Sequence, residues 1–451
     1  MFLALFFILS LTPLALGNEG AKLYGYIILF VFGLVGIFAC YRKKDVFLFA
    51  TPSNLIFFYI TFSMAFGAWG FSNGYVRVQK DFANYEAWNH THIALTLVML
   101  CLSIMFVVDY YYQNRYLRML SPQLLRVSHV QLLAAIVLLP FFFFSFELSL
   151  LGGEGDMSII PKSVFAVICI MYAGKYRAII RWLIYLAIIA FFASFSIQEK
   201  REAIFLIFPI IYLELLRSRE RITFKMLGIS IVLVAFLVIL ILAMSVARGY
   251  GGFGEFDSLL NAMPYIISYI KSDQFIVGFL HNIEVNYFFF HAMNSIELIM
   301  RDSGLISAGS TIIKPLFIFF PRDVIEWKPE SIISLYTTEY DPLYRASGGS
   351  WPINIISELI WNFGYFAPLA VAVLALFLVK MQLLMLRVWA DSKTFKFGFL
   401  LYAYMNLVMM ARGSGIDQYV VYMAGGGVFF AICLGIVCLV SAEQRMIKNN
   451  G

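Results

Sequence analysis

Long apolar runs recur along the whole chain, and each is close to the length that crosses a lipid bilayer. A helical span needs about 20 predominantly apolar residues. Hydrophobic residues make up 61% of the chain and charged residues 13%, which is about half the charged share of a typical soluble domain. A transmembrane β-barrel would show shorter segments of alternating hydrophobicity. The sequence therefore predicts an all-α polytopic membrane protein.

About twelve spans are predicted, and they divide the chain into three parts. Residues 1–247 hold the first nine spans, 248–352 form one long loop, and 353–451 hold the last three. The predicted spans are 2–17, 24–40, 52–71, 91–112, 130–150, 160–174, 179–197, 203–216, 225–247, 353–380, 397–411 and 418–440. The first of them ends in a sequence, Ala15-Leu16-Gly17, that resembles a signal-peptidase site, so it is either a span or a cleaved signal. No Lys or Arg precedes it, which argues against cleavage.

The distribution of Lys and Arg predicts the orientation of these spans. One alternating set of loops, beginning with Arg42, Lys43 and Lys44, carries most of the basic residues. Such loops face the cytoplasm. Both termini are therefore predicted to be cytoplasmic, and the 248–352 loop is predicted to face outward. Because the net charge of +6 arises mostly in short loops, it does not indicate nucleic-acid binding.

The outward loop is too apolar to be a free soluble domain. The stretch from Phe275 to Met300 is predicted to be an amphipathic helix that lies at the membrane interface or dips into the protein. Residues 311–320 are also apolar, but they are too few to cross a bilayer and they stop at Pro321. We expect them to form a re-entrant or interfacial element.

Basic side chains stand in separate connections on the predicted outer side. They are Lys200, Arg201, Arg248, Arg322, Lys328 and Arg412. A guanidinium suits phosphate because its planar fork donates two parallel hydrogen bonds, and a departing pyrophosphate needs such donors. The alternative is that these side chains only reach interfacial water from helix ends. That alternative is weaker for Arg322, because the neighbouring prolines fix the direction of the backbone there.

A polar stripe lies on the predicted tenth span. Asn354, Glu358 and Asn362 are spaced four residues apart, so they share one helix face. An ionisable group in a span is costly, and it should face the interior with a partner. Glu358 is a candidate general base or an anchor for a sugar hydroxyl or a cationic side chain. Alternatively, it belongs to a buried ion pair that only fixes helix packing.

Histidine and cysteine spacing gives little sign of a metal. His281 and His291 share a helix face with Glu284, but ten residues separate them, roughly 15 Å along an ideal helix. That distance is too great for one ion, and His281 is instead a candidate general base. The cysteines lie in apolar stretches without metal or disulfide spacing and are predicted to be packing residues. No nucleotide-binding loop is evident, so neither a metal nor another cofactor is predicted.

Four pieces of the chain resemble, in order, the Wzy-type O-antigen polymerases of bacterial surface polysaccharide assembly. The pieces are Glu199-Lys200-Arg201-Glu202, Pro321-Arg322 with Lys328-Pro329, Ser357-Glu358-Leu359 with Asn362-Phe363-Gly364, and Arg412-Gly413. The resemblance covers residues 195–440. Some members of that family carry an Arg-x10-Gly pattern in outward loops. In this chain the pattern begins only at Arg217 and Arg387, which are both in predicted cytoplasmic loops.

The resemblance implies a GT-C-like, metal-independent membrane glycosyltransferase. Such an enzyme transfers a growing glycan from undecaprenyl pyrophosphate to a lipid-linked repeat unit at the periplasmic face of the bacterial inner membrane. The implied partners are lipid-linked glycans, membrane lipids and a membrane protein that regulates chain length, and they include no nucleic acid. The functional positions implied are Arg322, Lys328, Glu358, Lys200, Arg201 and Arg412.

Aromatic residues of the outward loop add a candidate surface for sugar rings. They are Trp327, Tyr336, Tyr340, Tyr344 and Trp351, and interfacial belts also account for such residues. Two other functions fit the sequence. An O-antigen ligase uses the same donor, and a lipid-linked oligosaccharide flippase has a similar number of spans. A flippase should show two similar halves, whereas the polar residues here are crowded into one late segment.

Overall fold

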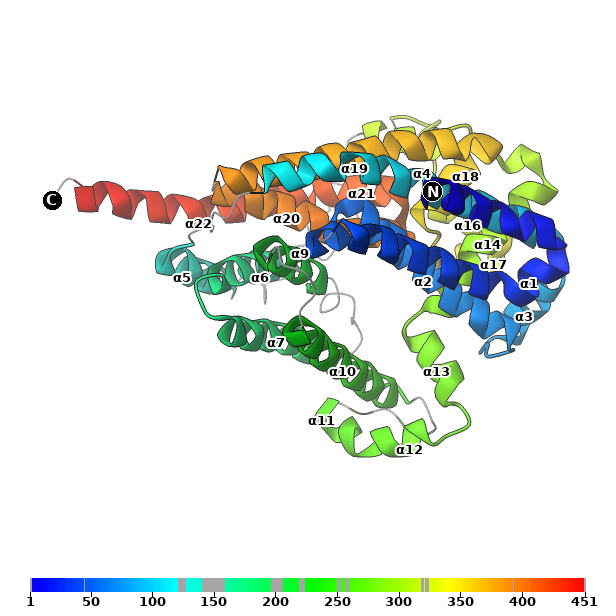
Figure 1. The fold of residues 1–451 in the computed structure, drawn as a ribbon, viewed down its shortest axis with the longest axis horizontal. Helices are drawn as coiled ribbons and strands as arrows, with labels where there is room; N and C mark the ends of the chain where they lie inside the picture. The colour runs from blue at the N-terminus through cyan, green and yellow to red at the C-terminus, as the bar shows by residue number, and fades with distance from the viewer. Residues whose placement is uncertain are drawn as a thin grey trace.

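The computed structural model describes residues 2–43, 45–120, 127–139, 159–195, 206–218 and 224–249, the single residues 252, 254 and 256, and residues 259–449 except 318–319, 321–323 and 392. Within this part every regular element is a helix and no strand occurs (Figure 1). Six of the described helices are long and apolar enough to cross a membrane. The prediction of an all-α membrane protein is therefore confirmed, whereas the number of twelve spans stays a prediction.

The six long apolar helical segments lie near the two ends of the chain. They are Ala4–Arg42, Pro52–Ser72, Thr91–Met119, Ile355–Ala390, Thr394–Gly413 and Gly415–Leu439. The first contains two predicted spans, because α1 (Phe2–Arg42) has a non-helical residue at Gly17, with φ 70° and ψ −176°. The rings of Phe6 and Phe32 lie 5.1 Å apart, so the two halves of α1 lie side by side as a helical hairpin.

The described part of the middle of the chain contributes five further helices. Each of the five spans predicted between 130 and 247 contains one of them, namely α5 (His129–Leu138), α6 (Ile159–Ala173), α7 (Ala178–Phe195), α9 (Ile207–Ser218) and α10 (Phe224–Ala247). Figure 1 places α7 and α10 below the main bundle and α22 (Gly426–Asn449) projecting away from it.

The main bundle is built around α1, α2 (Pro52–Ser72), α4 (Thr91–Met119) and α19 (Ala367–Ala390). α4 and α19 run side by side (Figure 1). Fully buried phenylalanines fill the space between α1, α2 and α4, and Phe57 lies 4.9 Å from Phe106 between ring centroids. Edge-on and tilted arrangements of this kind add to the energy of burial.

Hydrogen bonds between segments define the two ends of this bundle. At one end, Lys43 Nζ donates to Asn114 Oδ1 over 2.9 Å and joins the ends of α1 and α4. At the other, Lys22 Nζ donates to the carbonyl oxygen of Glu86 over 2.8 Å, and the Ser72 hydroxyl donates to the carbonyl oxygen of Lys22 over 2.7 Å. The connection from α2 through α3 (Gln79–Glu86) to α4 therefore lies at this second end.

The predicted span 353–380 corresponds to the apolar segment Ile355–Ala390, which is long enough to cross a membrane but is not one continuous helix. The helix is interrupted at Gly364, with φ 54° and ψ −127°, a conformation that favours glycine. A short helix α18 (Ile355–Phe363) and the turn η7 (Gly364–Phe366) precede α19, and Pro368 lies in the first turn of α19. The predicted polar stripe thus lies on a short buried helix that begins after its cap Asn354 and forms the first part of this segment.

The long segment 248–352 is helical and packs partly inside the protein. The single helix predicted from Phe275 to Met300 is two helices, α13 (Phe275–Asn282) and α14 (Val285–Arg301), because Glu284 adopts a left-handed conformation with φ 64°. Most of α14 is buried against α2, α4 and α18, which confirms the alternative in which this region dips into the protein. The predicted 311–320 element contains α15 (Ser310–Ile313) and η6 (Lys314–Phe317).

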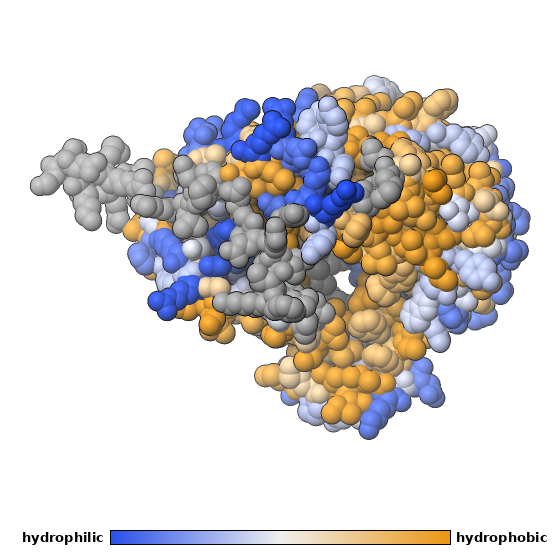
Figure 2. Space-filling model, in the orientation of Figure 1, coloured by the Kyte–Doolittle hydropathy of each residue, from blue (hydrophilic) through white to orange (hydrophobic). Residues whose placement is uncertain are grey.

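The remaining elements complete the chain. They are η1 (Val46–Ala50), α11 (Leu259–Ala262), η4 (Met263–Tyr265), α12 (Ile266–Ile270), η5 (Ser303–Leu305), α16 (Ile332–Tyr340), α17 (Pro342–Ala346), α20 (Thr394–Met409), the π-helical turn η8 (Met410–Ser414) and α21 (Gly415–Ala424). Figure 2 shows apolar residues over much of the visible body and over the α11–α12 region that projects from it.

Candidate anion-binding site

A cavity of about 600 Å³ opens between the end of α10, the start of α13 and the loop after α2. Its size is in the range of small-molecule sites. The lining residues are Val76, Arg77, Arg248, Gly249, Asp273, Gln274, Val277 and Gly278. Two arginines and one aspartate thus line one hollow, and guanidinium groups bind phosphate and carboxylate oxygens through paired hydrogen bonds.

Local structure explains why Arg77 is at this cavity. α2 ends with Gly74 in a left-handed conformation, φ 71°, and the Tyr75 amide donates to the carbonyl oxygen of Gly70 over 2.8 Å. This is the usual way in which glycine stops a helix. Asn286 of α14 then donates to the carbonyl oxygen of Tyr75 over 2.8 Å. The loop that carries Arg77 is therefore fixed to α14.

Arg248 reaches the cavity from a different direction. It follows the last residue of α10, and the next residue, Gly249, turns the chain with φ 77°. At the end of α13, Asn282 donates to the carbonyl oxygen of Ile241 over 2.9 Å and to the hydroxyl of Ser245. These bonds hold α13 against α10, so the cavity walls come from segments that are fastened to each other.

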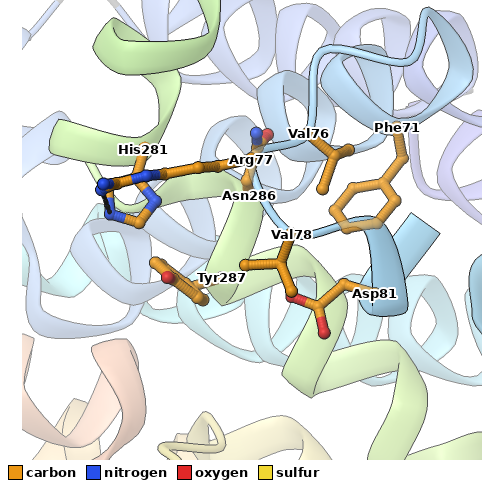
Figure 3. Close-up of a pocket in the computed structure, with 8 residues that line it drawn as sticks. All are labelled: Phe71, Val76, Arg77, Val78, Asp81, His281, Asn286 and Tyr287. Carbon is orange, nitrogen blue, oxygen red and sulfur yellow. Dashed lines mark hydrogen bonds between the residues drawn. The ribbon is translucent and has the colours of Figure 1, made fainter.

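A smaller pocket adjoins the cavity and shares Val76 and Arg77 with it. Its lining residues are Phe71, Val76, Arg77, Val78, Asp81, His281, Asn286 and Tyr287 (Figure 3). Arg77 Nη1 lies 3.3 Å from His281 Nε2, and the His281 ring lies 4.7 Å from the Tyr287 ring. The candidate base therefore lies directly beside the arginine-lined cavity.

Arg412 lies in the same row of side chains. It forms an ion pair with Glu284, the residue that joins α13 to α14. The Glu284 amide donates to the carbonyl oxygen of His281 over 3.0 Å. Arg412, Glu284, His281 and Arg77 thus form one continuous series of contacts, although they come from three distant parts of the chain.

Glu358 belongs to a second, fully buried network. Its Oε1 accepts the Thr311 hydroxyl at 2.9 Å, and its Oε2 accepts the Ile416 amide at 2.6 Å. Asn362 Nδ2 donates to Thr311 Oγ1 over 2.7 Å. Both carboxylate oxygens are engaged, and one of them holds the backbone shortly after Arg412. Among the roles considered for Glu358, this geometry favours that of an anchor.

An ion pair supports the same network. Lys314 Nζ lies 2.8 Å from Asp417 Oδ2, and the Asp417 side chain is fully buried. Asn354 caps α18 by accepting the Ser357 amide at 2.9 Å. Neither Asn354 nor Asn362 lines the cavity, so the structure separates the polar stripe from the cationic site.

The other basic residues predicted for the site do not line the cavity in the described part of the chain. Lys328 Nζ donates to the carbonyl oxygen of Phe320 over 2.9 Å and thereby closes a turn. Lys200, Arg201 and Arg322 lie outside the described residues. Of the predicted site residues, Arg248 and His281 line two adjoining pockets that share Arg77, and Arg412 is linked to the end of α13 through Glu284.

An aromatic cluster adjoins the smaller pocket. Tyr287 stacks on His291 with 6.0 Å between ring centroids, and His291 stacks on Trp351 at 4.6 Å. Trp351 also contacts Tyr344 at 4.8 Å. Burial lowers the pKa of His291 to about 3, so this ring is neutral. Tyr336 is fully buried, whereas Tyr344 and Trp327 are exposed, so only part of the predicted aromatic set is accessible to a sugar.

Asp81 closes the other side of the small pocket. Its Oδ1 accepts the Tyr340 hydroxyl at 2.8 Å. Burial raises the pKa of Asp81 above its usual value, and the Tyr340 hydrogen bond and the nearby Lys80 oppose that rise. Within the described residues, no group of three His, Cys, Asp or Glu side chains is placed to hold a metal ion.

Sequence reasoning missed two residues of this site. Arg77 looks like an ordinary loop residue, although the Asn73-Gly74 pair before it marks the end of a helix. Glu284 was considered only with the histidines as a metal ligand. Its pairing with Arg412 joins positions 128 residues apart, and no local pattern indicates such a contact.

The comparisons with known proteins add no relative. No protein-family model, no curated protein and no solved structure matches this chain. The fold and the site define a helical membrane protein with an arginine-lined cavity at one end of its bundle. Its activity must be inferred from that geometry and from the sequence motifs.

Proposed function

We propose that this protein is a membrane glycosyltransferase of the O-antigen polymerase type. It joins undecaprenyl-pyrophosphate-linked oligosaccharide repeat units into O-antigen or a related surface polysaccharide at the periplasmic face of the bacterial inner membrane. The observation that carries the proposal is the cavity lined by Arg77 and Arg248, with His281 beside it. This combination supplies donors for a diphosphate and a base within reach of the same ligand.

The proposed chemistry divides the residues by role. Arg77 and Arg248 bind the donor diphosphate and stabilise the charge that develops as it leaves. His281 takes the proton of the acceptor hydroxyl. The accessible edge of the aromatic cluster, with Tyr344 exposed and Trp351 partly buried, is where sugar rings stack. No step in this scheme requires a metal.

Other residues support the site. Glu358 holds the backbone after Arg412 through the Ile416 amide, so it acts as a positioning residue. Arg412 is paired with Glu284 and joins the diphosphate only if that pair opens. We include Lys200, Arg201, Arg322 and Lys328 as further cationic groups that bind lipid-linked substrate. Membrane lipids and a chain-length regulator are the proposed partners.

A reconstituted assay tests the proposal. Purified protein in lipid vesicles receives two lipid-linked repeat units and no lipid A core. A polymerase yields products longer than one repeat, whereas activity that requires the core indicates a ligase. Movement of the substrate across the bilayer without new linkages indicates a flippase. Either of the last two results would overturn the proposal.

Substitutions in the same assay test the cavity. Arg248→Ala is expected to lower the rate about 10²-fold, because one donor to the leaving group is lost. Lys271→Ala is a matched control, because Lys271 is an exposed cation near the cavity that does not line it. Arg322→Ala in cells is expected to leave surface polysaccharide of one repeat. An Arg248→Ala variant as active as the Lys271→Ala variant would contradict the assignment.

A further inference from the structure

Arg77 lies on the boundary between the two cavities, so it can contact a ligand in one and a residue in the other. It lines the larger cavity together with Arg248, and it lines the smaller pocket together with His281. In Figure 3 its side chain extends toward the imidazole ring. Arg77 Nη1 is 3.3 Å from His281 Nε2.

The chemistry of the two side chains fixes the direction of this hydrogen bond. A guanidinium has no acceptor, so Arg77 donates and His281 Nε2 accepts with its lone pair. The ring proton is then on Nδ1. A lone pair that accepts a hydrogen bond from Arg77 does not take a proton from a substrate hydroxyl. In this arrangement His281 is a poor base.

We propose that Arg77, besides binding the diphosphate, restrains His281 until a diphosphate enters the larger cavity, an inference that rests on the proposed function. Diphosphate oxygens attract Arg77 toward Arg248 through charge-assisted hydrogen bonds, which are about twice as strong as neutral ones. The bond from Arg77 to Nε2 then breaks. Nε2 then no longer accepts from Arg77, so donor binding turns His281 into a competent base.

The contact of Arg77 with His281 differs in charge from the contact of Arg412 with Glu284. Arg412 is paired with the carboxylate of Glu284, whereas the bond from Arg77 to His281 goes to a neutral ring. Replacing a hydrogen bond to a neutral acceptor by one to a diphosphate costs less free energy than breaking an ion pair to bind the diphosphate. Asp273 lines the same cavity as Arg248 and limits the excess positive charge there.

The proton transfer that follows is balanced. The acceptor O–H bond breaks and its proton moves to His281 Nε2, while the acceptor oxygen bonds to the anomeric carbon of the donor glycan. The bond from that carbon to the phosphate oxygen breaks, and its electron pair leaves with undecaprenyl pyrophosphate. His281 then passes its proton to water.

Carbethoxylation of His281 by diethyl pyrocarbonate reports directly on this lone pair. The full chain in phosphatidylethanolamine and phosphatidylglycerol nanodiscs is treated with and without inorganic pyrophosphate, at matched ionic strength with sodium sulfate. Mass spectrometry measures the modification rate at each histidine. We expect pyrophosphate to raise the rate at His281 about threefold, equivalent to about 0.65 kcal/mol at 1.36 kcal/mol per tenfold. The rate at His90, which is paired with Glu297, should stay the same.

Two variants complete the design. Arg77→Ala should show the raised His281 rate without pyrophosphate and no further increase with it. Arg115→Ala removes an exposed arginine of α4 outside both cavities and should behave as the wild type.

Isothermal titration calorimetry of pyrophosphate binding distinguishes a failure of the role of Arg77 from a failure of the proposed function. Binding without a change at His281 overturns the role of Arg77 and leaves the anion site standing. No binding to the wild type overturns both the role of Arg77 and the cavity assignment in the proposed function.

Discussion

Glu358 is a buried carboxylate that holds the backbone shortly after Arg412. It accepts hydrogen bonds from the Thr311 hydroxyl and the Ile416 amide. Glu358→Ala would leave both donors buried without this acceptor, at a cost of about 1–3 kcal/mol each. Glu358→Gln keeps one acceptor and can donate to Thr311 Oγ1, so its loss should be much smaller. Thermal unfolding of the purified variants in detergent measures the difference.

Activity of the same variants distinguishes positioning from base catalysis. If Glu358 anchors the backbone, Glu358→Gln should retain most of the polymerising activity. An inactive Glu358→Gln variant with wild-type stability would show instead that the carboxylate takes part in proton transfer, which would remove His281 from that role.

Glu284 competes with any anion for Arg412. The two side chains form an ion pair, so a diphosphate must displace the carboxylate before it can bind Arg412. Glu284→Gln removes that charge, and we expect it to tighten inorganic pyrophosphate binding about fivefold. Isothermal titration of the purified protein gives the Kd. Glu339→Gln, at an exposed position of α16, is the matched control, and an equal Kd in both variants would argue against competition at Arg412.

At the scale of elements, the close crossing of α2 and α14 sets the position of the site. A Cβ on Gly67 would lie 2.3 Å from Phe289 Cβ and 2.4 Å from the carbonyl oxygen of Val285. Gly67→Ala therefore forces α14 to shift, and overpacking of this kind costs about 1–3 kcal/mol. Because α14 carries Tyr287 and Asn286, the shift should also weaken pyrophosphate binding. Thermal unfolding and titration measure the two effects.

A second glycine provides the control for this prediction. A Cβ on Gly228 of α10 would meet no atom within 4 Å. Gly228→Ala should leave stability unchanged or raise it by about 0.5–1 kcal/mol, because alanine favours helix. Equal stability of the two alanine variants would mean that α14 does not pack on Gly67 as described.

Elements differ in how far the sequence predicts them. Long apolar runs such as Pro52–Ser72 and Thr91–Met119 were predicted to within a few residues at their starts, because burial in lipid requires length and composition alone. The breaks at Gly364 and Glu284 were missed. Glycine is compatible with both helical and left-handed backbone conformations, so Gly364 alone does not indicate a break. Glu284 adopts the left-handed conformation and also pairs with Arg412. Such breaks depend on tertiary contacts that no local pattern contains.

The candidate site was predictable only in part for the same reason. Arg248 and Arg412 were singled out because they lie in connections on the predicted outer side, and His281 because it shares a predicted helix face with Glu284 and His291. Arg77 was not, since its importance arises from a contact with His281 across 204 residues of sequence. Polar residues could be nominated from the sequence, but their grouping into a cationic cavity and a separate buried network around Glu358 required the fold.

At the scale of the whole molecule, the bundle has two chemically different ends. At one end, Lys43 donates a hydrogen bond to Asn114. Arg42, Arg115 and Arg118 are close to these two residues in the sequence. The other end carries the connection from α2 to α4. This connection contains Arg77, which lines the cavity. The proposed function requires this second end to face the periplasm, and the greater number of basic residues at the first end favours that orientation.

Single added cysteines test this orientation. Asn73 and Asn114 are both exposed and lie at opposite ends of the bundle, while four of the five native cysteines are buried. In intact spheroplasts, a membrane-impermeant maleimide should label Asn73→Cys and should reach Asn114→Cys only after permeabilisation. The parent protein without added cysteine gives the background. The reverse pattern would place the arginine-lined cavity in the cytoplasm, where no periplasmic lipid-linked glycan can enter it, and the polymerase proposal would then be wrong.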